Sequence, residues 1–297
     1  MSEMNTKFLE KEFDYIKPAS LSEALDILSE REKVKIFAGG TDLMVKLKVG
    51  APIEMNTMLD INAIGELFGT KCAESGIEIG AAEKISALEK NEAILSRYQG
   101  LYEAFHAMAS VSVRNMATLG GNFCNASPVA DASCAVLAYN GSVKLVKKGG
   151  ERLVSAEDFF LAPGVSVLTP DELLYSIVIP APKENTGAVY IKLSRVKSDI
   201  AKLSVCVVLS REGDKIRECR ITMAAVAAKP LYLKEISQGL AGRSVSEALM
   251  LETAKRISEF IHPIDDNRTT AQYRKDVTKI IARDALYEAW KRSGGKL

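Results

Sequence analysis

The chain has 297 residues, of which 47% are hydrophobic and 26% are charged. This length suits two or three smaller domains with sizeable cores, and the composition excludes a disordered or fibrous protein. Lys and Arg number 39 against 38 Asp and Glu, so there is no basic surplus to neutralise phosphates, and we expect no nucleic-acid partner.

The N-terminal segment is mixed in charge. Residues 1–18 carry acids and bases throughout and lack the apolar core of a signal peptide, so we expect a cytoplasmic protein. The longest poorly charged segment, residues 115–143, is interrupted by Gly120, Gly121 and Pro128. Because these residues break a membrane-spanning helix, we predict no transmembrane segment.

Helix and strand patterns alternate in the first part of the chain. Ser20 and Glu23 have the spacing of a capping box and predict a helix that begins directly after Ser20. Residues 33–38 alternate as a strand, and the sharp turn at Gly39–Gly40 leads into a predicted helix over 41–50. The first glycine pair is therefore expected between a strand and a helix.

The middle of the chain continues this alternation. A strand is predicted over 76–82, and Ser86 with Glu89 repeats the capping-box pattern ahead of another helix. Residues 101–110 have a helical pattern too. After the loop "TLGGNFCNASPVAD" a helix is predicted to begin at Asp131, whose side chain is expected to cap it.

After Gly141 the pattern changes to strands that are followed by helices. Strands are predicted over 142–148, 172–180, 187–196, 203–210 and 215–227, and helices from about Leu233 to 292. The segment 180–187 is rich in Pro and polar residues, which predicts a boundary between a domain over 1–180 and a separate α+β domain over 187–297.

Several common sites are absent from the sequence. It contains no G-x-G-x-x-G, no P-loop and no H-E-x-x-H motif. The two histidines, His106 and His262, are too few for a histidine metal cluster, and the five cysteines have no spacing typical of zinc or iron–sulfur ligands. We therefore predict no metal site and no catalytic histidine.

Two glycine-rich turns remain as candidate binding elements, "AGGTD" at 38–42 and "TLGGN" at 118–122. Glycines let backbone N–H groups approach an anion closely, so the pair can hold the two halves of a pyrophosphate. A Cβ at Gly120 would then obstruct the phosphate. On spacing alone, two ordinary tight turns explain the pattern equally well.

Four segments in this order, "AGGTDL", "TLGGNFCNASPVADA", "FFLAPGVSVLTPDELLYSIVIP" and "KLSRVKSDIAKLSV", resemble the FAD-binding medium subunit of the molybdenum hydroxylases. That family includes xanthine dehydrogenases, aerobic carbon monoxide dehydrogenase and nicotinate dehydrogenase. The resemblance implies an α+β fold of the vanillyl-alcohol-oxidase-like type, with FAD-binding subdomains over about 1–60 and 61–180. A smaller C-terminal domain, an antiparallel sheet with helices, is expected over 187–297.

The resemblance also implies which residues contact FAD. Asp131 matches an acid that bonds the cofactor, Lys192 a basic residue near the flavin, and Met108 and Leu174 apolar contacts. The alternatives are a core position for Met108 and unspecific surface charge for Lys192. For Asn125 and Ser127, which the resemblance places on the loop beside the flavin, the alternative is a purely turn-forming role. The full set implied to bind FAD is Ile36, Phe37, Ala38, Gly39, Gly40, Thr41, Asp42, Leu43, Met108, Thr118, Leu119, Gly120, Gly121, Asn122, Asn125, Ser127, Asp131, Leu174 and Lys192.

The function implied by the resemblance is electron transfer. A subunit of this kind takes electrons from the [2Fe–2S] clusters of a small partner subunit and passes them to an acceptor such as NAD, while a molybdopterin-binding large subunit hydroxylates the substrate. Two alternatives stay open: a freestanding flavin oxidase or reductase of the same fold, and a nucleotide-binding module without redox chemistry. FAD is the expected cofactor in the first two cases.

Overall fold

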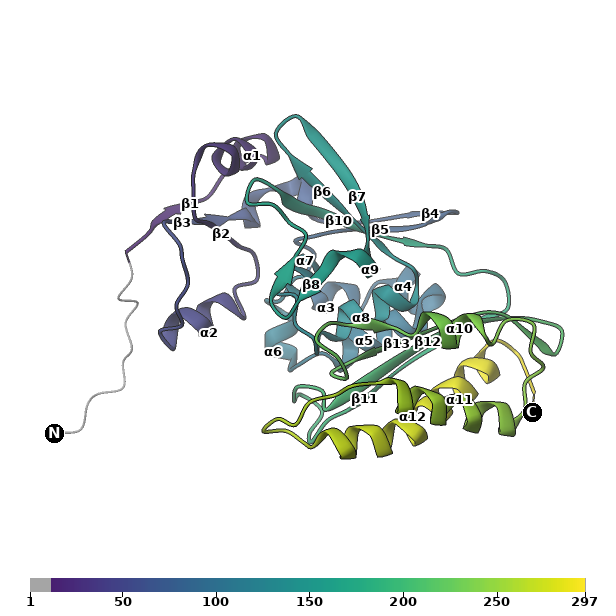
Figure 1. Ribbon diagram of the computed structural model, residues 1–297. Coiled ribbons are helices and arrows are strands. Elements are labelled where there is room, and N and C mark those ends of the chain that lie inside the picture. The colour runs from purple at the N-terminus through teal and green to yellow at the C-terminus, as the bar shows by residue number, and fades with distance from the viewer. Residues whose placement is uncertain (1–11, 297) are drawn as a thin grey trace.

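The computed structural model describes residues 12–296. The prediction that the chain has no signal peptide was based on residues 1–18. Most of that segment lies outside the described residues. Figure 1 shows an N-terminal unit in purple, a central teal unit around a second sheet, and a C-terminal unit in green and yellow. The fold is α+β, as predicted, with three main sheets and helices packed on them.

The N-terminal unit is a parallel sheet in the order β1-β3-β2. Its elements are β1 (Asp14–Ile16), α1 (Leu21–Glu30), β2 (Val34–Phe37), α2 (Leu43–Lys48) and β3 (Thr57–Asp60). Ser20 caps α1 by accepting a hydrogen bond of 3.2 Å from the Glu23 N–H, as the capping-box pattern predicts. Ala24 and Leu28 of α1 are buried against Leu59 of β3. The predicted strand, glycine turn and helix around Gly39 are all present.

The second sheet is antiparallel, in the order β4-β5-β10-β6-β7. Its strands are β4 (Thr70–Ala73), β5 (Gly76–Gly80), β6 (Ser142–Lys147), β7 (Gly150–Ser155) and β10 (Leu173–Pro180). Two short helices, η1 (Ile61–Ala63) and η2 (Gly65–Leu67), connect it to the first sheet. A small hairpin, β8 (Phe160–Ala162) with β9 (Val165–Ser166), follows α9 (Ala156–Phe159).

Helices fill the long connection between β5 and β6. They are α3 (Ile85–Leu88), α4 (Glu92–Arg97), α5 (Gln99–Ala107), α6 (Val111–Arg114), α7 (Leu119–Cys124) and α8 (Asp131–Ala138). The capping box expected at Ser86 is wrong, because Ser86 lies inside the single turn of α3. Asn91 caps the following helix instead, and its side chain accepts hydrogen bonds from Ala93 N and Ile94 N at 3.0 and 3.2 Å.

The C-terminal unit is an antiparallel sheet followed by helices. The strands are β11 (Thr186–Leu193), β12 (Leu203–Glu212), β13 (Lys215–Ala224) and β14 (Leu231–Tyr232), and the helices are α10 (Lys234–Gln238), α11 (Glu247–Phe260) and α12 (Ala271–Arg292). This order of strands and then helices agrees with the sequence prediction.

Both faces of the C-terminal sheet are covered. Side chains alternate along its strands, so Val189 and Val205 share a core with α11 and α12, whereas Tyr190 and Cys206 face the core of α5 and α8. The sheet thus lies between helices that precede it and helices that follow it in the sequence. One face of the sheet thus completes the core of the central unit, and the other face forms a separate core with α11 and α12.

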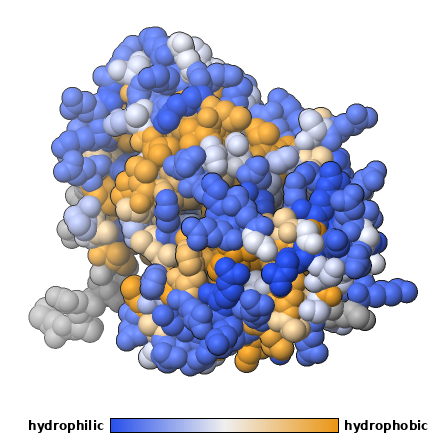
Figure 2. Space-filling model, turned by 45° about the vertical axis from the view of Figure 1, so that its right-hand side comes forward, coloured by the Kyte–Doolittle hydropathy of each residue, from blue (hydrophilic) through white to orange (hydrophobic). Residues whose placement is uncertain are grey.

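The surface is mixed in character. Figure 2 shows that hydrophilic residues cover most of one face, whereas hydrophobic residues gather across its upper half. Within residues 12–296, the helices are too short or too polar for any of them to cross a lipid bilayer.

Gly187 of β11 lies directly against the C-terminal part of α12, and it provides a test of this packing. A Cβ there would lie 2.0 Å from the Ala289 carbonyl oxygen and 2.5 Å from Ser293 N. We expect Gly187→Ala to lower the free energy of unfolding by about 1–3 kcal/mol, because backbone must move to relieve the contact. Urea unfolding measures the change. Gly65→Ala, where no atom lies within 4 Å, is the control, and equal effects of both substitutions would contradict this account.

Candidate cofactor-binding site

The first glycine turn presents unpaired hydrogen-bond donors. Gly40 has φ +68°, a left-handed conformation that favours glycine, and a Cβ there would lie 2.4 Å from the Phe37 ring. Among the described residues, the backbone N–H groups of Gly39, Gly40 and Thr41 have no acceptor. The Thr41 side chain is exposed and equally unpartnered. These donors are available to an anionic ligand.

The structure brings the two glycine segments together. A Cβ on Gly39 would lie 2.2 Å from the Met116 carbonyl oxygen, so the first turn packs directly on the segment that leads to the second. Lys84 donates hydrogen bonds to Met116 O at 3.1 Å and to Asn62 Oδ1 at 3.4 Å. Asn62 Nδ2 in turn donates to Ala38 O at 2.9 Å. Lys84 and Asn62 therefore hold the segments in contact.

The second glycine segment is a short helix rather than a turn with free amides. Thr118 caps α7, and its hydroxyl accepts a hydrogen bond of 3.1 Å from Gly121 N. Gly120 N donates to Ala81 O at 2.8 Å, and Leu119 N donates to Glu83 O at 3.1 Å. These N–H groups are already satisfied by protein acceptors, in contrast to those of the first turn.

Gly120 is needed for packing. A Cβ at this position would lie 2.7 Å from both the Cβ and the carbonyl oxygen of Ala81. The structure thus gives Gly120 a packing reason that the sequence did not indicate, and its place beside a phosphate stays a prediction. Its hydrogen atom lets α7 lie against the turn after β5. Leu119, fully buried beside it, supports the same contact.

Asn122 contributes a buried polar atom without a partner. Its Oδ1 has no hydrogen-bond partner within residues 12–296, and its Nδ2 lies 3.9 Å from Met108 Sδ. A buried amide oxygen without a donor is costly, so this atom is available to a ligand that carries a hydroxyl or N–H group. Met108 itself is only 6% exposed and belongs to the hydrophobic core.

Asp131 is the first residue of α8, and the prediction that its side chain caps that helix is wrong. Ala130 is the cap residue, and the Asp131 carboxylate is directed to β11 instead. It accepts hydrogen bonds from the Tyr190 hydroxyl and, at 3.2 Å, from Lys192 Nζ, which also donates to Ala107 O at 2.9 Å. The Lys192 and Asp131 side chains are only 4% and 9% exposed. The two residues form a buried ion pair.

The environment of this pair shifts two pKa values. Burial raises the pKa of Asp131, although the charge of Lys192 and the hydrogen bonds from Tyr190 and Lys192 oppose the rise. Burial also raises the pKa of Tyr190 well above its ordinary value, and the neighbouring Asp131 adds to that effect. Tyr190 is therefore a hydrogen-bond donor to the carboxylate.

The remaining predicted residues differ in their surroundings. Asn125 and Asp42 are bridged by Lys46, whose Nζ lies 3.1 Å from Asn125 Oδ1 and 2.6 Å from Asp42 Oδ2. By contrast, Ser127 accepts a hydrogen bond from Val129 N at 3.4 Å, and Leu174 is 2% exposed in the core. Ile36, Phe37, Ala38 and Leu43 are partly buried around the first turn.

Four residues at this site were not identified from the sequence, namely Lys46, Asn62, Lys84 and Tyr190. Lys46 follows Asp42 by four positions, a spacing that predicts an ion pair on a helix. Tyr190 precedes Lys192 by two positions and so shares its face of a strand. Asn62 and Lys84 reach the turns only through tertiary structure, and no local pattern could have indicated them.

Comparisons with known proteins cover nearly the whole chain. Residues 11–182 match the family described as the FAD binding domain in molybdopterin dehydrogenase, and residues 188–289 match the CO dehydrogenase flavoprotein C-terminal domain. The chain is 31% identical to the glyceraldehyde dehydrogenase medium chain of Sulfolobus acidocaldarius, over 93% of this chain and 98% of that protein. It is also 31% identical to the caffeine dehydrogenase subunit beta of a Pseudomonas species, over 93% and 94%.

Solved structures agree with these matches. A carbon monoxide dehydrogenase from Hydrogenophaga pseudoflava that lacks the Mo-pyranopterin moiety of the molybdenum cofactor aligns with a TM-score of 0.91 at 29% identity. The alignment covers 95% of this chain and 98% of that one. A second carbon monoxide dehydrogenase, from Oligotropha carboxidovorans, gives the same TM-score at 27% identity, over 96% and 100% of the two chains.

The buried pair predicts a pH-dependent effect of Lys192→Met. This substitution leaves the buried Asp131 carboxylate without its cation. We therefore expect it to lower the free energy of unfolding by about 3–5 kcal/mol at about pH 8. Lys192 opposes the rise in the pKa of Asp131, so its loss raises that pKa further. Because protonation then neutralises the buried group as pH falls, the effect should be smaller at about pH 5.

Urea unfolding at the two pH values measures this difference. Lys255→Met, which replaces a lysine with a 72% exposed side chain, serves as the control and should change little at either pH. If Lys192→Met lowers the free energy of unfolding equally at both pH values, the loss does not come from an unpaired Asp131 carboxylate, and this account is wrong.

Proposed function

Because the chain belongs to the family of FAD-binding medium subunits of molybdenum hydroxylases, we propose that it is the electron-transfer subunit of such an oxidoreductase. It takes electrons from [2Fe–2S] clusters of a small partner subunit and passes them to an acceptor such as NAD. Substrate hydroxylation belongs to a molybdopterin-binding large subunit. The complex works in the cytoplasm.

One observation carries the assignment of the binding site, namely the unpaired N–H groups of Gly39, Gly40 and Thr41 at the end of β2. Backbone donors without a protein acceptor suit the pyrophosphate of FAD, which offers several anionic oxygens. The residues present fit this group. The unpartnered Asn122 Oδ1 supplies an acceptor for a hydroxyl or N–H of the same cofactor.

In this proposal the second glycine segment has a structural role and does not bind phosphate through its backbone. The N–H groups of Leu119 to Asn122 are bonded within the protein, so this segment positions α7 and the Asn122 side chain. Lys84 and Asn62 keep the two segments in contact. The chain therefore binds phosphate with one turn and uses the other to shape the wall of the site.

FAD, when bound, accepts single electrons from iron–sulfur centres and releases them in pairs to an acceptor such as NAD. The contribution of the chain is binding and electrostatics. Lys192 is held in a fixed position by Asp131 and by Ala107 O, so it supplies a buried cation beside the proposed cofactor site. Both Asp131 oxygens already accept hydrogen bonds, which leaves this acid unsuited to act as the base of a freestanding oxidase.

Exposed apolar residues close to the turns support a role within an assembly. Val45 in α2 and Val49 directly after it are 58% and 63% exposed, and Val111 in α6 and Met116 just after that helix are 60% and 52% exposed. Apolar side chains gathered near a functional site are typical of surfaces that partners cover. This arrangement is consistent with a partner that docks near the cofactor.

Replacement of Thr41 tests the phosphate site without disturbing packing, because its side chain is exposed. We expect Thr41→Val to weaken FAD binding about tenfold or more, since a hydrogen bond to a charged group is lost. Titration of the apoprotein with FAD, followed by the flavin absorbance, measures the dissociation constant. Thr41→Ser keeps the hydroxyl and should restore binding. An unchanged dissociation constant for Thr41→Val would remove Thr41 from the site.

Reconstitution of the complex tests the function. Substrate should bleach the flavin absorbance rapidly only when the FAD chain, the iron–sulfur chain and the molybdenum chain are all present. Omission of the iron–sulfur chain should abolish the bleaching, since electrons then have no route to FAD. Bleaching of the FAD chain by substrate alone would favour the freestanding oxidase instead. A chain that never takes up FAD would exclude both functions.

A further inference from the structure

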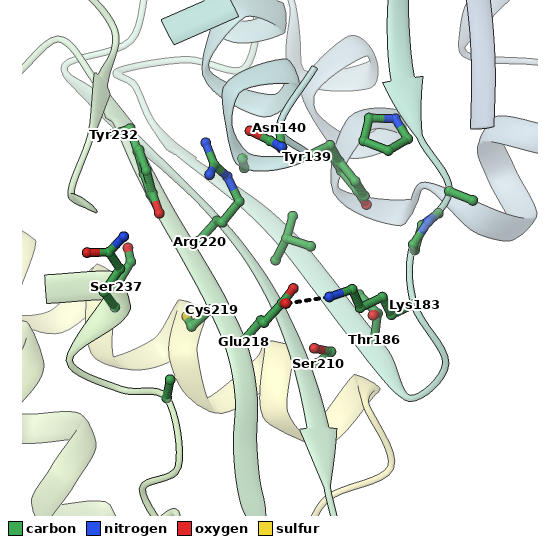
Figure 3. A pocket seen from close by; sticks show the side chains of 17 residues that line it. Tyr139, Asn140, Lys183, Thr186, Ser210, Glu218, Cys219, Arg220, Tyr232 and Ser237 are labelled. Atoms are coloured by element: carbon green, nitrogen blue, oxygen red, sulfur yellow. Dashed lines mark hydrogen bonds and ion pairs between the residues drawn. The ribbon is translucent and has the colours of Figure 1, made fainter. Parts of the chain in front are cut away.

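A cavity of about 520 Å³ lies at the junction of the central and C-terminal units, away from the glycine turns. It adjoins the C-terminal end of α8, at Tyr139 and Asn140, whereas Asp131 begins the same helix. Eight residues of helix separate Asp131 from Tyr139 by about 12 Å. Figure 3 shows the cavity over β12 and β13, with Lys183 and Glu218 paired at one side.

Arg220 is the dominant charge in this cavity. Its guanidinium stacks on the Tyr232 ring at 3.8 Å, and its Nε and Nη2 both donate to Leu137 O, at 3.3 and 3.2 Å. These contacts fix the plane of the group and leave Nη1 without an acceptor among the described residues. In the described chain no carboxylate lies within ion-pair distance of Arg220.

This cation is incompletely compensated. Burial lowers the pKa of Arg220, although Tyr232 and the charges of Glu157 and Glu218 oppose the fall, so these neighbours do not fully offset the cost of removing the charge from water. Leu137 lies near the C-terminal end of α8, where the partial negative charge of the helix offsets only part of the guanidinium charge. Lys183 and Glu218 neutralise each other, so the lining keeps one positive charge in excess.

The floor of the cavity defines the length of a ligand. Val208 pairs with Arg220 and Ser210 pairs with Glu218 in the β12–β13 ladder, so these side chains share one face. In the part of the chain that the structure describes, the buried Ser210 Oγ has no hydrogen-bond partner, so no bond prevents it from turning toward a ligand. Arg220 and Ser210 are therefore diagonal neighbours on paired strands. The backbones of two such residues lie about 7–8 Å apart, and this separation sets the scale of the ligand.

The walls are flat and apolar. Pro180 and Pro182 line one side, and the Tyr139 ring lines another, with its hydroxyl already accepting a hydrogen bond from Gly100 N at 3.2 Å. Rings of this kind pack well against an aromatic body. The cavity volume falls within the range of small-molecule sites.

We propose that this cavity binds a flat aromatic monocarboxylate whose carboxylate pairs with Arg220 and whose far end carries a hydroxyl that bonds Ser210. The ligand lies over Val208 and contacts both units, so it stabilises their junction. This site is separate from the proposed FAD site and does not depend on the electron-transfer role.

Calorimetric titration of the full FAD-loaded chain tests the proposal with three probes. We expect 6-hydroxy-2-naphthoate to bind with a dissociation constant of about 1 mM or below, as suits a ligand of its size. The neutral 6-hydroxy-2-naphthamide should bind about tenfold more weakly or worse, because it lacks the charge. 2-Naphthoate should bind more weakly than the hydroxylated acid, because it cannot bond Ser210. Equal binding of acid and amide, or no saturable binding of the acid, would overturn the proposal.

Matched variants locate the binding. Arg220→Gln should weaken 6-hydroxy-2-naphthoate about tenfold or more, whereas Arg217→Gln, an exposed change on the same strand outside the lining, should leave it unchanged. Ser210→Ala, which removes an unpartnered hydroxyl, should fold normally. In this variant 6-hydroxy-2-naphthoate should bind no more tightly than 2-naphthoate. Unchanged affinity in both Arg220→Gln and Ser210→Ala would place the ligand elsewhere.

Two further measurements distinguish binding in this cavity from binding at the flavin site and from occupation of the cavity by a partner chain. Thr41→Val should leave binding of the acid intact, and a loss there would place the ligand at the flavin site instead. The assembled complex should bind the acid as the single chain does. If the complex fails to bind it, a partner chain fills the cavity and the proposal is overturned.

Discussion

The buried contact between Asp131 and Lys192 is the constraint on which the arrangement of the two halves depends. Every residue of α8 is buried, and Asp131 is the one ionised side chain among them. A lone carboxylate in such a helix would be strongly destabilising, so the helix requires a cation at a defined place. Lys192 provides it from β11, and Tyr190 adds a second donor from the same strand face. The strand is thereby fixed against the N-terminal end of α8.

The proposed cofactor site is stiff because independent elements meet in it. The first glycine turn belongs to the N-terminal sheet, whereas α7 belongs to the helical connection after β5. Direct packing of Gly39 on Met116 joins them, and the partly buried Lys84 and Asn62 reinforce the contact. The exposed bridge from Lys46 to Asp42 and Asn125 adds little energy, since water screens such pairs. The relative position of the two glycine segments therefore depends more on backbone contact than on surface charge.

The sequence predicted most of the elements because their signals are local. The glycine turn between a strand and a helix, the Ser20 cap and the strands after Gly141 all depend on spacing within a few residues. What the local patterns missed has tertiary causes. Asp131 begins a helix, but its partner lies 61 positions later, and Gly120 packs on Ala81, which no local pattern connects to it. Likewise the unpaired amides at Gly39–Thr41 and the occupied amides at Leu119–Asn122 look alike in sequence, and only the fold distinguishes them.

The covered C-terminal sheet has a consequence for the order in which the chain folds during synthesis. The inner faces of α5 and α8 are completed by β11, β12 and β13, which leave the ribosome later than the helices do. Until then Asp131 remains hydrated and charged, and the apolar face around it stays open to chaperones or to aggregation. The arrival of Lys192 both neutralises the acid and closes that face. Newly made chains that stop before residue 186 should therefore be recognised as incomplete by cellular quality control.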